Sequence, residues 1–311
     1  MKHNRKSIGR YTPLGLFWAL TTGRFSSLNG FDEVKNRFKF AVRSALTLPW
    51  TLRWLGTFNQ QPALLEYLHQ APRLACKLHR PYLYRSLGAA GKVAVLKAHY
   101  SHIAKGFTPA VRRILLSHDS LTLATLEGKD GARFSCTLTH NHSFDKEGEL
   151  SLQFVDEQVH AALAKLTFTI CQQNAQLVII VGGLQGPRKT LGGESIRSAT
   201  KACHGLFPKR LALEALIGIA QHIGCQQILA VCKDEHIYSS WRYRRDFQAD
   251  YDSFWESLGS SKTGRHFFRT PFPIPRKAME DIASKKRSEY TRRYALLDSL
   301  EAQIHHSLHQ E

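Results

Sequence analysis

The spacing of the apolar residues changes near residue 113 from a helical period to a strand period, and this change limits the fold class. Before it, Phe38 and Val42 recur at the spacing of one helix face. After it, residues 120–141 alternate apolar and polar side chains in two runs around a glycine-containing turn, which is typical of a β-hairpin. The sequence therefore predicts two domains, a helical region over residues 1–113 and a mixed α/β region over residues 114–311.

The α/β region begins as an antiparallel meander. After the hairpin come three more strand-like runs with short links, at residues 149–156, 160–171 and 176–184. A glycine-rich loop and a helix over residues 208–224 then lead to a strand at 226–232, so the crossover makes strands 176–184 and 226–232 parallel neighbours. The remainder predicts, in order, a helix, an edge strand and a long C-terminal helix, at residues 251–259, 265–275 and 278–308. The fold class is α+β.

Positive charge is concentrated at the start of the chain. The net charge is +18, and residues 1–113 hold 19 Lys and Arg against three acidic residues, which gives that part +16. Such an excess predicts an anionic partner, either the phosphates of a nucleic acid or the anionic lipid head groups of a membrane surface. A solvated basic surface without a partner is the alternative.

Composition bears on the compartment. The apolar content of 43% supports a packed core, and no apolar run approaches the roughly 20 residues that span a bilayer. The six cysteines show no C-x-x-C spacing and several stand in apolar stretches, which indicates reduced core residues. We therefore expect a cytoplasmic protein that is peripheral on the inner membrane if it binds lipid.

The best candidate for a binding site is the glycine-rich loop at residues 182–210. A glycine-rich exit from a buried strand, followed by two helix starts, presents backbone N–H groups and partial positive charge to a phosphate. The candidate ligand-binding residues are Gly182, Gly183, Gln185, Gly186, Arg188, Lys189, Arg197, Lys201, Lys209 and Arg210. Neither of the usual glycine-rich nucleotide motifs occurs here, and glycines that only permit a tight strand exit are the alternative.

Three residues are candidates for proton transfer. His204 follows the first helix of this loop and titrates near neutrality, Asp252 lies beside aromatic residues in DYDSFW, and Tyr290 lies in the basic helix KKRSEYTRRY. For each of them a structural role is the alternative: a helix cap, a buried carboxylate and a packed ring. Glu149 begins a strand, and we expect it to be exposed. His140 and His142 share a strand face without a third ligand, so we expect no metal.

Five motifs in order resemble the VirK/YbjX family of bacterial proteins over about residues 30–300. They are EGELSL, GGLQGPR, RSATKACHGLFPKRLALEAL, YDSFWESLG and KKRSEYTRRYALL. The resemblance implies a role in envelope homeostasis, resistance to antimicrobial peptides and virulence, and one member of the family is linked to post-transcriptional control of a surface virulence protein. It implies no catalytic residues.

A second resemblance concerns the fold. An antiparallel meander followed by strand, loop, helix and parallel strand is similar to the GNAT acyltransferase core, whose loop before the helix holds the pyrophosphate of an acyl-CoA. The matching residues are Gly182, Gly183, Gln185 and Gly186, with Lys209 and Arg210 at the helix start. The sequence departs from the GNAT pattern in one respect, because residues 187–207, including a predicted extra helix, stand between the glycines and that helix.

Together these observations lead to one hypothesis and two alternatives. The hypothesis is a GNAT-like acyltransferase that acts on envelope components at the inner membrane face, with acyl-CoA or an acyl carrier protein as donor. The first alternative is a non-catalytic nucleic-acid-binding regulator. The second is a membrane adaptor without chemistry, which binds anionic lipid through Arg37, Lys39 and Arg43.

Overall fold

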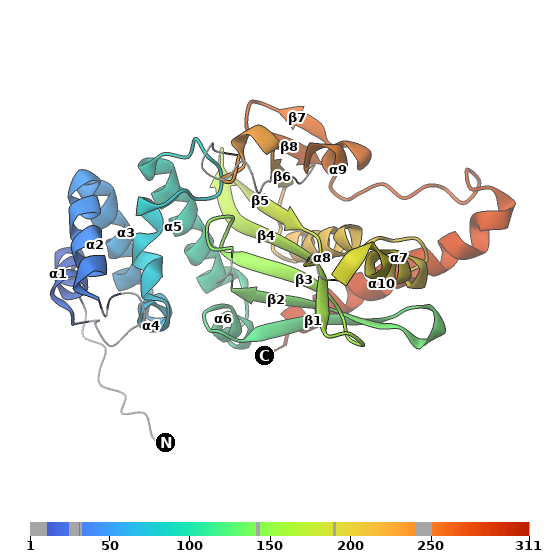
Figure 1. The fold of residues 1–311 in the computed structure, drawn as a ribbon, viewed down its shortest axis with the longest axis horizontal. Coiled ribbons are helices and arrows are strands. Elements are labelled where there is room, and N and C mark those ends of the chain that lie inside the picture. Colours follow the sequence, from blue (N-terminus) through green and yellow to red (C-terminus); the bar gives the residue numbers. More distant parts are fainter. Residues whose placement is uncertain are drawn as a thin grey trace, which may run out of the picture.

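The computed structural model describes residues 11–24, 31, 33–140, 144–188, 191–239 and 251–310, and it confirms the α+β fold class (Figure 1). Seven helices precede the first strand: α1 Pro13–Thr22, α2 Val34–Leu46, α3 Leu48–Gln60, α4 Pro62–Gln70, the 3₁₀ helix η1 Pro72–His79, α5 Ala89–Gly106 and α6 Pro109–Leu115. Five of these helices have a proline in the first turn, where a backbone N–H has no intrahelical acceptor and its absence costs no hydrogen bond. α6 ends two residues beyond the predicted boundary at residue 113.

The strands form one eight-stranded mixed sheet in the order β1-β2-β3-β4-β5-β6-β8-β7. Their bounds are β1 Ser120–Glu127, β2 Arg133–His140, β3 Leu150–Asp156, β4 Ala161–Gln173, β5 Gln176–Gln185, β6 Gln227–Val231, β7 Ser261–Thr263 and β8 Phe267–Thr270. The predicted meander is confirmed, because β1 to β5 pair antiparallel in sequence order. The predicted crossover is also confirmed, because β5 and β6 pair parallel.

Four α-helices lie after β5 in the described chain: α7 Gly192–Ala202 and α8 Pro208–His222 precede β6, α9 Tyr251–Ser257 precedes β7, and α10 Ser284–Leu308 follows β8. α8 is the crossover helix, and Gly224 just beyond it has φ +67°, a left-handed conformation that suits glycine. α10 lies beside α8 on one side of the sheet, whereas helices α1 to α4 lie on the other and α6 contributes Val111 and Leu115 to the cluster of α8 and α10 (Figure 1).

The sheet is buried on both faces, which gives three layers. In β5, Ile179 and Val181 belong to the hydrophobic cluster formed with α8 and α10, whereas Val178 and Ile180 belong to the cluster formed with α1 to α5. Because successive side chains of a strand point to opposite faces, the continuous apolar run of β5 covers both clusters. The N-terminal helices therefore share a core with the central strands.

Two elements differ from the sequence prediction: β8 in its place in the sheet, and α10 in its first residue. β8 is not an edge strand, because it pairs with β6 on one side and β7 on the other. Pro271 and the prolines after it follow β8 rather than interrupt it, so they end the strand without removing its hydrogen bonds. α10 begins at Ser284 instead of residue 278, because the preceding residues turn and bury Ile282.

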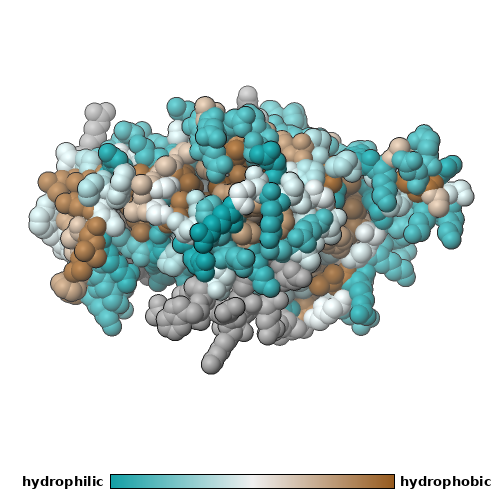
Figure 2. Space-filling model, turned by 90° about the horizontal axis from the view of Figure 1, so that it is seen from above, coloured by the Kyte–Doolittle hydropathy of each residue, from teal (hydrophilic) through white to brown (hydrophobic). Residues whose placement is uncertain are grey.

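Two surface properties complete the fold. In the described part of the chain no helix is both long and apolar enough to cross a membrane. Hydrophobic residues are nevertheless exposed at one end of the molecule, the end that α1 and α2 form (Figure 2).

Candidate functional site

A bulge in β5 makes room for a buried acidic segment. Thr167 of β4 pairs with Gly183 and Phe168 pairs with Val181, so Gly182 is an extra residue in β5. A Cβ atom at Gly182 would overlap the carbonyl oxygen of Glu147, and one at Gly183 would overlap its carboxylate. These two glycines therefore allow the chain around Glu147 to approach the strand closely.

Glu147 is a buried carboxyl group without a cationic partner among the described residues. Its residue exposure is 1%, and the side-chain amide of Gln185 donates to both carboxylate oxygens at 3.0 and 3.2 Å. Burial raises its pKa to about 8, although the Gln185 hydrogen bond acts in the opposite direction. The group is therefore mostly protonated at neutral pH and ionises just above it.

His236 is the second titratable group at this place. Its Nε2 lies 3.8 Å from a carboxylate oxygen of Glu147, and the residue is 1% exposed. Burial lowers the pKa of His236 to about 4, against the opposing effect of a hydrogen bond with the Gly182 backbone. Because the imidazole is neutral at pH 7, it does not stabilise the ionised form of Glu147 by charge.

The Glu147 carboxyl lies at the carboxyl ends of the parallel strand pair. Pairing between β5 and β6 ends at Val181 and Ala230, and β5 continues to Gln185. β6 stops at Val231 and is followed by the short helix η4 Lys233–Glu235 and then His236. The carboxyl thus contacts both chains where they stop pairing, the position at which α/β proteins bind their ligands.

A second carboxylate, Glu149, anchors the same segment and does not behave like Glu147. It is fully buried, so the expectation that it is exposed is wrong. Lys77 of η1 donates to it at 2.7 Å, and the hydroxyl of Tyr100 donates to its other oxygen. Burial is the largest single effect on the pKa of Glu149 and would raise it, but Lys77, His140 and His99 together outweigh burial and lower the pKa to about 2.

The network around Glu149 extends across the helical layer. Tyr100 of α5 lies 3.1 Å from Nε2 of His140, and the hydroxyl of Tyr67 lies 2.8 Å from its Nδ1. The backbone N–H of Glu149 donates to the carbonyl of Phe168 at 3.1 Å. These contacts fix the segment on the sheet, and Glu147 remains as its carboxyl group with a raised pKa.

The predicted ligand residues fall into two groups in the structure. Gly182, Gly183 and Gln185 meet at Glu147, as described above, and the exposed Gly186 and Arg188 follow them. The others lie on helices: Lys201 is exposed on α7, the Lys209 ammonium lies 5.9 Å from the Phe254 ring centroid, and Arg210 forms a 2.6 Å ion pair with Glu214. Arg197 is exposed on α7, and Lys189 lies outside the described residues.

Of the three predicted proton-transfer residues, His204 and Tyr290 both contact Arg293, whereas Asp252 contacts η4. Nε of Arg293 donates to the carbonyl of His204 at 2.9 Å, and the same guanidinium lies 4.2 Å from the ring centroid of Tyr290. Burial lowers the pKa of His204. Asp252 accepts a 2.8 Å hydrogen bond from the N–H of Lys233, so it supports η4, the helix that precedes His236.

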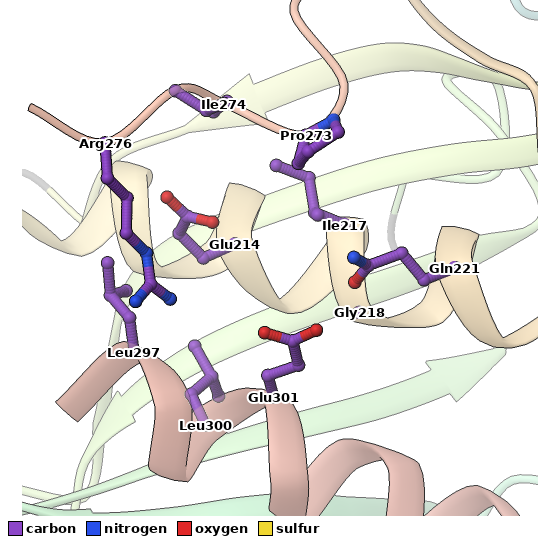
Figure 3. A pocket seen from close by; sticks show the side chains of 10 residues that line it. All are labelled: Glu214, Ile217, Gly218, Gln221, Pro273, Ile274, Arg276, Leu297, Leu300 and Glu301. Atoms are coloured by element: carbon purple, nitrogen blue, oxygen red, sulfur yellow. The ribbon is translucent and has the colours of Figure 1, made fainter. Parts of the chain in front are cut away.

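Neither a metal site nor the cavity between α8 and α10 competes with this location. The described residues contain no group of three metal-ligating side chains; His140 is bonded to tyrosines and His142 lies outside those residues. Figure 3 shows Glu214, Gln221 and Glu301 directed toward the cavity between the two helices. Its volume is about 60 Å³, far below the roughly 300–1,000 Å³ of typical small-molecule pockets.

Sequence reasoning missed Glu147 and His236. Glu147 stands in KEGEL, whose polar composition is typical of an exposed turn, and His236 stands in KDEHIY, which carries no known motif. The available signal was indirect: EGELSL and the double glycine are both among the motifs of the family resemblance, and the structure places them against each other.

Comparisons with known proteins give family relatives but no structural neighbour. The DUF535 family, described as a protein of unknown function, matches residues 29–306. The uncharacterized protein YbjX of Escherichia coli strain K12 is 38% identical over 294 residues, which cover 94% of this chain and 89% of YbjX. An uncharacterized protein of Haemophilus influenzae is 28% identical over 190 residues, 61% of this chain and 62% of its own. No solved structure gives a significant match.

Proposed function

This chain belongs to the DUF535 family, the family of YbjX, and from the surroundings of Glu147 we propose that it is an acyltransferase. The observation that carries the proposal is a protonatable carboxyl group at the end of the parallel strand pair, which accepts hydrogen bonds from Gln185 and lies 3.8 Å from Nε2 of His236. The sheet order and the bulge at Gly182 support the resemblance to the GNAT core, in which the acyl donor binds beside the corresponding strand.

The chemistry we propose is transfer of an acyl group from a thioester to an amine or hydroxyl. The acceptor nitrogen or oxygen attacks the thioester carbonyl, and its proton passes to the ionised Glu147 carboxylate. The tetrahedral intermediate collapses with loss of the C–S bond, and Glu147 returns the proton to the departing thiolate sulfur. A pKa of about 8 suits both halves of this cycle near neutral pH.

The donor in this proposal is acyl-CoA or an acyl carrier protein. Its phosphates would lie beyond the end of β5, near the exposed Gly186 and Arg188. Lys201, Lys209 and Arg210 add positive charge on the helices that follow, although Arg210 already has Glu214 as a partner. Gly186 has open space around it and an ordinary φ, so a large side chain at this position tests the donor's location without straining the fold.

The experiment uses the full chain with acetyl-CoA, palmitoyl-CoA and palmitoyl acyl carrier protein as probes. We expect at least one donor to raise the melting temperature, and we expect Gly186→Trp to abolish the shift while Gly88→Trp, at another open glycine, preserves it. With a primary amine supplied as acceptor, release of thiol from the donor should be lost in Glu147→Gln and retained in Glu127→Gln, whose carboxylate is exposed at the end of β1. Absence of a shift with all three donors would refute the proposal.

In the cell, we propose that this activity modifies an envelope component at the inner membrane face. The support is the family resemblance, which implies envelope homeostasis, resistance to antimicrobial peptides and virulence. A strain that lacks the gene should become more sensitive to a cationic antimicrobial peptide, and wild type should restore its resistance. Glu147→Gln, present at the same level, should not restore it; full complementation would contradict an enzymatic role.

A further inference from the structure

The exposed end of the helical layer carries an unusual apolar surface. Seven of the nine large hydrophobic side chains exposed in the described residues lie between residues 14 and 48: Leu14, Trp18, Val34, Phe38, Val42, Leu46 and Leu48. Trp18 is 57% exposed, Phe38 69% and Leu46 83%. We call the four of them that lie on α2, Val34, Phe38, Val42 and Leu46, the apolar face; Figure 2 shows hydrophobic residues gathered at this end of the molecule. Such a concentration marks a binding surface more often than a solvated one.

The orientation of α2 shows that the apolar face is not a misplaced core stripe. Val34, Phe38, Val42 and Leu46 follow one another at intervals of four residues, so they form one line along the helix. The side of α2 that packs inward is a different one, formed by Phe40 and Ser44. At 3.6 residues per turn the two sides are roughly opposite. α2 thus has two apolar sides, and only one has a partner within the described chain.

Positive charge surrounds the apolar face. The described residues 11–24 and 33–60 contain six basic residues, Arg24, Lys35, Arg37, Lys39, Arg43 and Arg53, and one acidic residue, Glu33. None of the six takes part in the ion pairs found between described residues. A second copy of this surface would bring like charges together. The charge pattern complements an anionic surface instead.

A basic cavity lies on the inward side of α2, where Phe40 is buried. It measures about 110 Å³ and is lined by Lys39, Arg43, Arg73 and Arg80 together with Phe40, Cys76 and His79 among others, with no carboxylate in its lining. Lys39 and Arg43 belong both to this cavity and to the charged border of the apolar face. These two cations therefore lie between the apolar face and a basic recess, one of whose arginines, Arg80, is already paired with Asp145 at 2.9 Å.

We propose that the apolar face inserts into the surface of an anionic phospholipid bilayer and that the basic side chains at its border, Lys39 and Arg43 among them, contact the lipid phosphates. Leu46 and Phe38 enter the acyl region, and the lysine and arginine side chains extend toward the head groups. An aliphatic stripe of this exposure has no use in binding RNA, which is recognised by cations and stacked aromatic rings. This inference is independent of the proposed acyl transfer, because it uses residues on a different layer of the molecule.

Vesicle sedimentation of the full chain tests the inference. We expect binding to vesicles that mix phosphatidylglycerol with phosphatidylcholine, and none to phosphatidylcholine alone. Phe38→Ser with Leu46→Ser should weaken binding by at least about a hundredfold, since each buried apolar side chain contributes roughly tenfold or more. Lys39→Gln with Arg43→Gln should weaken it by about 25-fold, roughly fivefold per charge. The four residues changed in these two variants are exposed, so both variants should keep the wild-type melting temperature.

Two control variants separate this surface from general hydrophobicity and charge. Val159→Ser removes a side chain that is 54% exposed elsewhere, and Lys285→Gln with Lys286→Gln removes two exposed charges from α10. Both should bind vesicles like wild type. Three results would each overturn the inference. The first is that the serine variant still binds anionic vesicles, and the second is that this variant changes the oligomeric state of the protein instead of its vesicle binding. The third is that a short RNA competes with vesicles for the same residues.

Discussion

The replacement Glu147→Gln should stabilise the protein in a way that grows with pH. The carboxyl has a pKa of about 8 in the folded protein against an ordinary value of 4.5. Between these two pH values the unfolded chain has released the proton and the folded chain retains it, so each rise of one pH unit costs the folded wild type about 1.4 kcal/mol. Glutamine has nearly the same shape and does not ionise, so the variant avoids this cost.

The magnitude follows from the same two values. Over the whole interval from 4.5 to about 8 the wild type loses roughly 5 kcal/mol relative to the variant. At pH 5 the variant should be more stable by only about 1 kcal/mol, and at pH 8 by roughly 4 kcal/mol. Every other titratable group is common to the two proteins, so their difference isolates Glu147.

Urea denaturation of both proteins at pH 5, 6, 7 and 8 measures this difference. The matched control is Glu127→Gln, because that carboxylate is exposed to water in the folded protein as well as in the unfolded chain. Its difference from wild type should stay constant with pH. If the difference for Glu147→Gln is also constant, the carboxyl is ionised in the folded protein and the reasoning from its burial is wrong.

Three further predictions concern the same region. Lys77→Met should reduce the free energy of unfolding at pH 7 by about 3–5 kcal/mol in urea denaturation, because Glu149 then remains buried without its cation; a loss below 1 kcal/mol would contradict this. Gly182→Ala should reduce the free energy of unfolding by about 1–3 kcal/mol, because the added methyl group overlaps the Glu147 carbonyl. Gly193→Ala, in open space on α7, should not reduce it. Equal losses in the two variants would disprove the close approach of Glu147 to β5. The rate of acyl transfer should rise with pH to a plateau above about 8, because only ionised Glu147 accepts a proton; a rate that falls over pH 6–8 would exclude this role.

The sequence by itself determined the order of the elements and much of their pairing. The change from a helical to a strand period identified the helical layer and the meander, and Pro208 with Gly224 marked the ends of the crossover helix α8. These features depend on local backbone preferences, which are set by residues close together in the sequence. The sequence also carried the excess of positive charge, which does not depend on the fold.

Only the tertiary structure decided what the acidic segment and the apolar stripe do. Lys77 and Tyr100 reach Glu149 from 72 and 49 residues away in the chain, and His236 reaches Glu147 from beyond β6. A local reading of KEGEL therefore predicts exposure, whereas packing removes both carboxylates from water and moves their pKa values in opposite directions. The spacing of Phe38 and Val42 likewise identifies a helix face. Whether that face of α2 is buried or exposed depends on how α1, α3 and η1 pack against the helix.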